Sequence, residues 1–175
     1  MRLSLVAVVV FFTSVPAAAQ KPPVQFSVPA PSEWVHIDGA KNPELIPEWS
    51  VWKHAFMVFG VASELPTDVM KHLSKEEAAA VRAAAAQHRK DTSACEQRGL
   101  KLRPMLETEA VDAVNRKTEE LNLECRWQTL RLRDRLLEAL RSDGQVALRQ
   151  WVEAAKAGIR VSVPKKELDF YLKPK

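Results

Sequence analysis

Glycine and cysteine are both scarce in this chain, and each scarcity argues against a class of function. Only five of the 175 residues are glycine, and the sequence contains neither a glycine-rich phosphate loop nor a G-x-S-x-G nucleophile elbow. The two cysteines, Cys95 and Cys125, lie far apart instead of forming a C-x-x-C pair. Thioredoxin-like redox chemistry and covalent haem attachment therefore lack their usual sequence support.

Long apolar runs are also missing, except at the start of the chain. Arg2 precedes an apolar block over residues 3–12, and residues 17–19 are three alanines that offer a small-x-small cleavage pattern. This arrangement predicts a signal peptide over residues 1–19, a mature protein that begins at Gln20, and export to the periplasm or the medium. No later stretch approaches the roughly 20 apolar residues of a membrane span, so we expect no transmembrane anchor.

The charge is only mildly basic, with a formal net charge of +4. Lysine, arginine and the acidic residues alternate along the chain, which is typical of solvated helix faces, and we expect no nucleic-acid partner.

The organisation predicted for the mature chain is a linker followed by one domain. Residues 20–33 are rich in proline and should form an extended linker. Residues 34–46 contain the turn signals Asp38-Gly39 and Asn42-Pro43, which indicate an irregular lid. We assign residues 34–175 to a single all-α domain, a three- to four-helix bundle that ends in a short extended tail.

The first predicted helix covers residues 47–61 and begins at Pro47, whose fixed φ suits the first position. A stripe of aromatic residues repeats along it at i, i+3, i+7 and i+10: Trp49, Trp52, Phe56 and Phe59. Because the helix is apolar nearly all round, it should be buried at the centre of the bundle. The alternative interpretation is an aromatic groove that binds an apolar ligand or partner segment, and these four residues are its candidates.

Three further helices are predicted from capping signals and periodicity. Ser74 and Glu77 form a capping box for a helix that should end by Gly99 or before Pro104. A long helix should run to Leu140, and Ser142 with Gln145 should cap a final helix that ends at Gly158. Residues 159–163 and the tail, which carries Leu168, Phe170, Tyr171 and Leu172, read as an extended segment.

The inner stripe of the long helix is predicted from bundle spacing to contain Leu123, Trp127, Leu130 and Leu137. On this assignment, the substitution Trp127→Ala should cost about 3 to 5 kcal/mol, the range for truncating a large core aromatic residue.

The cysteines provide a test of helix register. An intramolecular disulfide between Cys95 and Cys125 is the expected state in an oxidising compartment. In an antiparallel hairpin this bond requires a turn centred near residue 110, whereas Gly99 and Pro104 place the apex nearer residue 102. The bond therefore implies that much of residues 100–115 is loop, or that the second helix continues past Gly99.

Metal and catalytic residues are poorly supported. Asp68, His72 and Glu76 have helical spacing, but a helix boundary at Ser74 falls inside the triplet and should scatter them. His54 and Met57 are too few to define a copper site. We therefore assign no metal site, no cofactor and no catalytic residue.

These observations favour an exported, non-enzymatic helical protein that binds a protein or apolar partner in the cell envelope, in an adaptor, chaperone-like or structural role. Two alternatives remain: a sensor domain for a small molecule or metal, and an enzyme without a recognisable motif. The sequence leaves the oligomeric state open.

Overall fold

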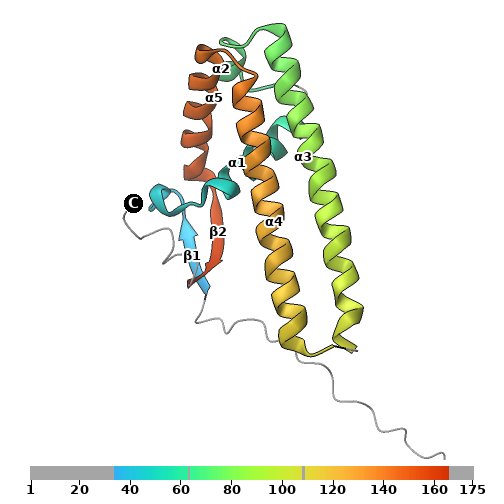
Figure 1. Ribbon diagram of the computed structural model, residues 1–175. Helices are drawn as coiled ribbons and strands as arrows, with labels where there is room; N and C mark the ends of the chain where they lie inside the picture. Colours follow the sequence, from blue (N-terminus) through green and yellow to red (C-terminus); the bar gives the residue numbers. More distant parts are fainter. Residues whose placement is uncertain (1–33, 63, 108, 166–175) are drawn as a thin grey trace, which may run out of the picture.

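The computed structural model describes residues 34–165, with residues 63 and 108 excepted. The predicted signal peptide, the linker and the tail beyond residue 165 lie outside the described residues. The all-α expectation is confirmed, with a small two-stranded sheet at one side of the bundle (Figure 1). In chain order the elements are β1 (Trp34–Asp38), η2 (Pro43–Leu45), α1 (Glu48–Val61), α2 (Thr67–Met70), α3 (Lys75–Leu102), η3 (Arg103–Glu107), α4 (Val111–Glu138), α5 (Ser142–Ala155), η4 (Lys156–Gly158) and β2 (Arg160–Pro164).

Helix α1 lies at the centre of the core, as its composition predicts. Its Phe56 ring stacks on His88 of α3 with 5.2 Å between ring centroids, and Phe59 meets Trp151 of α5 at 4.8 Å. Pro47 is the N-cap residue, with an extended backbone, so the helix begins one residue later than predicted. A helix that is apolar on most sides is stable in water only when other helices cover it.

Helices α3 and α4 form a long antiparallel hairpin that extends past the other elements (Figure 1). The hydrophobic core takes residues from α3 only as far as Ala85 and from α4 only from Leu132 onward. We call residues 89–128, which lie beyond these limits, the arm. Within the arm, Val114 and Leu121 are buried. Since two helices alone bury little apolar surface, the arm cannot be stabilised as the core is.

The predicted inner stripe of α4 is wrong at Leu123 and Trp127, whereas Leu137 is buried as predicted and Leu130 is half-buried. Trp127 is 58% exposed and Leu123 is 51% exposed, while the buried positions of this helix are Val114, Leu121, Thr129, Leu132, Leu136 and Leu137. The prediction rested on the helical spacing of these apolar residues. At the level of Trp127, however, no element among the described residues covers the face of α4 that carries the tryptophan, which is why its side chain is exposed.

The predicted irregular lid over residues 34–46 is also wrong in part, because its first five residues form β1. This strand pairs antiparallel with β2, in a register that places Trp34 opposite Pro164 and Asp38 opposite Arg160. The extended conformation predicted for residues 159–163 is thereby confirmed, and it has a ladder partner. Gly39 follows β1 and packs closely against η4, where a Cβ atom would lie 1.8 Å from the carbonyl oxygen of Lys156.

Helix α3 begins at the predicted capping box. The Ser74 hydroxyl accepts a hydrogen bond from the Glu77 backbone N–H, and the Glu77 carboxylate accepts one from the Ser74 backbone N–H at 2.7 Å. The second predicted box is wrong: α5 has Arg141 as its N-cap residue, and Gln145 donates to the carbonyl of Leu140 instead.

Glu77 caps the start of α5 as well. Its buried carboxylate accepts from the Arg141 backbone N–H at 2.6 Å and from Arg141 Nη2 at 2.9 Å. The hydrogen bonds from the Arg141 side chain, from the Ser74 backbone and from the Arg141 backbone lower the pKa of Glu77 to about 2. One side chain therefore joins the first turn of α3 to the turn between α4 and α5.

No helix in the described ranges is both long enough and apolar enough to span a bilayer.

The different burial of Phe56 and Trp127 predicts a large loss of stability for one alanine substitution and almost none for the other. Phe56→Ala should lower the free energy of unfolding by about 3 to 5 kcal/mol, because Phe56 is 1% exposed. Trp127→Ala should change it by no more than about 0.5 kcal/mol, because the indole is mostly solvated. Urea denaturation of the two variants measures both values. A large loss for Trp127→Ala would show that this side chain is packed in solution.

The Glu77 contacts predict an acid-sensitive stability. A carboxylate with a folded pKa near 2 and an unfolded pKa near 4.5 contributes its full stabilisation above pH 4.5 and loses it as the pH falls toward 2. We expect Glu77→Gln to lower the urea midpoint at pH 7 and to flatten its decline between pH 4.5 and pH 2. The exposed Glu120→Gln serves as the control. Identical pH profiles for wild type and Glu77→Gln would contradict this account.

Candidate functional site

A disulfide joins the two helices of the arm. Cys95 of α3 and Cys125 of α4 have their Cα atoms 6.2 Å apart, and the predicted pairing is confirmed. The register problem is resolved at the tip of the hairpin: α3 continues past Gly99 to Leu102, and α4 starts only at Val111. The connection between them is centred close enough to residue 110 for the sulfurs to meet.

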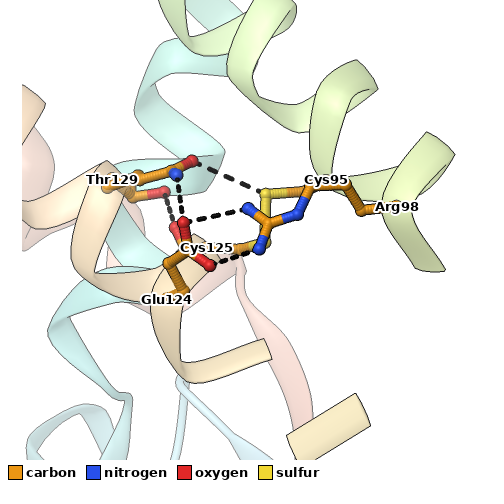
Figure 2. The surroundings of a disulfide bond; sticks show 6 residues. Cys95, Arg98, Glu124, Cys125 and Thr129 are labelled. Atoms are coloured by element: carbon orange, nitrogen blue, oxygen red, sulfur yellow. Dashed lines mark hydrogen bonds and ion pairs between the residues drawn. A yellow bond between two sulfur atoms is a disulfide. The ribbon is translucent and has the colours of Figure 1, made fainter. Parts of the chain in front are cut away.

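Polar side chains surround the disulfide (Figure 2). The Arg98 guanidinium donates to both Glu124 oxygens, at 2.9 and 2.6 Å, and these bonds hold the pKa of the Glu124 carboxyl below its usual range. Gln128 donates to Glu124 at 3.2 Å. Its amide oxygen also lies 3.6 Å from the Cys95 sulfur. This is a van der Waals contact and not a hydrogen bond, because a disulfide sulfur has no proton to donate. A covalent bond and a bidentate ion pair thus join the two helices of the arm.

A cleft of about 380 Å³ opens beside the disulfide, between α1, α3 and α4. Its volume falls within the range of small-molecule sites. Helix α1 contributes Trp49 and Lys53 to the lining, and the remainder comes from the two helices of the hairpin: His88, Asp91, Thr92, Cys95, Glu96, Gly99, Thr118, Leu121, Asn122, Cys125, Arg126, Gln128 and Thr129.

Trp49 lies at the edge of this cleft with its polar atom unsatisfied. Its indole Nε1 is buried, and within the described part of the chain it has no hydrogen-bond partner. The Arg126 guanidinium lies 4.5 Å from the centroid of the indole ring, a cation–π contact between α4 and α1. A buried N–H group without an acceptor costs free energy, so this position favours a ligand or water that can accept a hydrogen bond.

His88 forms part of the inner wall of the cleft and is buried. Burial, and after it the nearby charge of Lys53, lowers the pKa of His88, while Asp91 opposes the shift. The imidazole is therefore neutral at pH 7 and serves as an aromatic surface stacked on Phe56.

The structure separates the four aromatic residues that the sequence nominated for partner binding. Trp52, Phe56 and Phe59 are buried in the core, and only Trp49 is partly exposed. The four side chains therefore do not form an exposed groove. Trp49 instead belongs to the cleft, together with residues that periodicity along α1 could not have identified.

The candidate metal ligands are not brought together. Asp68 lies in α2, His72 follows that helix, and Glu76 is in the first turn of α3, so the three residues belong to different elements. Over the ranges that the structure describes, no group of three or more His, Cys, Asp or Glu side chains is placed to hold a metal ion.

One exposed apolar surface, on the arm, was not predicted from the sequence. Leu123 and Trp127 are four residues apart on α4, so they project from the same face, and both are about half exposed or more. We call this pair the α4 patch. Its signal was present in the sequence as an apolar repeat, but the repeat was assigned to the core.

Comparisons of the chain with models of protein families, with curated proteins and with solved structures found no match. Any function assigned to this chain therefore rests on its own geometry.

Proposed function

We propose that this chain is an exported, non-enzymatic helical protein that binds a partner protein in the cell envelope through the α4 patch. The supporting observation is the exposure of Trp127 beside Leu123 on a covalently joined helical hairpin. Tryptophan is enriched among residues that dominate binding energy at protein interfaces, and an exposed apolar pair has little value for solubility.

The disulfide supports this proposal because it holds α3 and α4 together and so preorganises the helix that carries the patch. A partner that binds a preorganised helix pays little of the entropy that ordering a free segment would cost. Exposed charged residues of both signs surround the patch on α4: Arg116, Glu120, Arg131 and Asp134. Mixed charge is typical of the polar rim of a protein interface, whereas a membrane-binding surface is rich in lysine and arginine. We therefore expect the partner to offer an apolar protein segment flanked by charges.

The non-enzymatic part of the proposal is supported by the structural roles of the perturbed carboxylates. Glu77 caps two helices, and Glu124 pairs with Arg98 across the arm. Perturbed acids often mark catalytic sites, but these two have structural partners that account for their lowered pKa values.

The test is site-specific photocrosslinking in cells that produce the full chain. A benzoylphenylalanine at position 127 should crosslink a discrete protein in the envelope fraction, and the same probe at Gln150, an exposed residue of α5, should not. Substitution of Leu123 with Ser should weaken the crosslink from position 127 without changing the folded fraction. Equal crosslinking from both probe positions, or none from position 127, would contradict the proposal.

A further inference from the structure

Hydrogen-bond donors from two helices gather at one side of the cleft. Trp49 and Lys53 are four residues apart on α1 and therefore lie on the same face, and Arg126 of α4 reaches over the Trp49 ring. The Trp49 N–H is buried and, within the described residues, lacks an acceptor. Two cations and an unsatisfied donor thus share one wall of the cleft.

Lys53 lines the cleft together with His88. Its charge contributes, after burial, to the lowered pKa of His88. The neutral imidazole beside it adds no charge to repel an anion, and it can either donate or accept a hydrogen bond. A negative group at this position would lie beside Lys53 and the neutral imidazole, both of which line the cleft.

The lining residues that come from α3 and the hairpin interior differ in character from these donors. Asp91 and Glu96 come from α3, and the Asp91 carboxylate accepts a hydrogen bond from Gln87 along the same helix at 2.8 Å. Leu121 and the disulfide sulfurs supply apolar surface. Gly99 leaves space above Leu121, because even a Cβ atom there would be 3.9 Å from the leucine side chain.

We propose that this cleft is a binding site for a small amphipathic anion, a carboxylate or sulfonate on an apolar body. The anionic group accepts from the Trp49 N–H and lies near Lys53 and Arg126, and the apolar body covers Leu121 and the disulfide. Asp91 and Glu96 of α3 also line the cleft and disfavour a negative group beside them, so the anionic end lies on the side of Trp49 and Lys53. The proposal is independent of the α4 patch, whose residues do not line the cleft.

The test uses naphthalene-1-sulfonate as the anionic probe and naphthalene-1-methanol as its neutral counterpart. The chain has five tryptophans, so its ¹⁵N-indole spectrum reports each of them separately. We expect the sulfonate to shift the Trp49 indole resonance in a saturable manner with one site per chain. The neutral compound should bind at least about ten-fold more weakly, as expected for the loss of a charge-assisted hydrogen bond.

Two variants distinguish this site from unspecific adsorption. Lys53→Gln, at an exposed position, should weaken sulfonate binding by about ten-fold, and Trp49→Phe, which keeps an aromatic ring, should weaken it similarly. Isothermal titration calorimetry measures the affinity of every variant, because Trp49→Phe lacks the reporting indole. Trp127→Ala should bind as wild type does, and the remaining indole resonances verify that each variant is folded. The proposal is overturned if the Trp49 resonance does not move, if both compounds bind equally, or if folded Lys53→Gln retains wild-type affinity.

Discussion

The disulfide between Cys95 and Cys125 is the constraint on which the arm of this structure depends. The hydrophobic core, built around α1, ends at Ala85 on α3 and Leu132 on α4, yet the hairpin continues well beyond both. Closing a loop of 30 residues in the unfolded chain is worth about 3 to 4 kcal/mol by chain entropy, more than exposed ion pairs ordinarily contribute. The disulfide thus stabilises a part of the hairpin that the hydrophobic core does not reach.

The rigid arm explains why the two candidate surfaces lie where they do. In a three-layer bundle the α4 patch would be covered, and the cleft would be filled by side chains from another helix. Because α1 covers only the base of the arm, Trp127 remains exposed on one face and a cleft remains beside the disulfide. A protein partner and a small anion would therefore use the same arm through different faces.

The sequence predicted local features better than long-range ones. The capping box at Ser74 and the burial of α1 depend on residues close in the chain, and both are confirmed. The pairing of β1 with β2, and the capping of α5 by Glu77, join segments that no local pattern connects. Trp127 was misassigned because helical periodicity identifies an apolar face without indicating whether anything covers it. The same limit hid the cleft, whose walls come from three helices.

Hydrogen exchange of the full chain, oxidised and then reduced with a phosphine, tests the central claim most directly. We predict that reduction lowers the protection of backbone amides between Cys95 and Cys125 by about a hundred-fold, while amides of α1 keep theirs. Equal protection of the arm in both states, or loss of protection in α1 and the arm together, would show that the disulfide does not hold a separate arm.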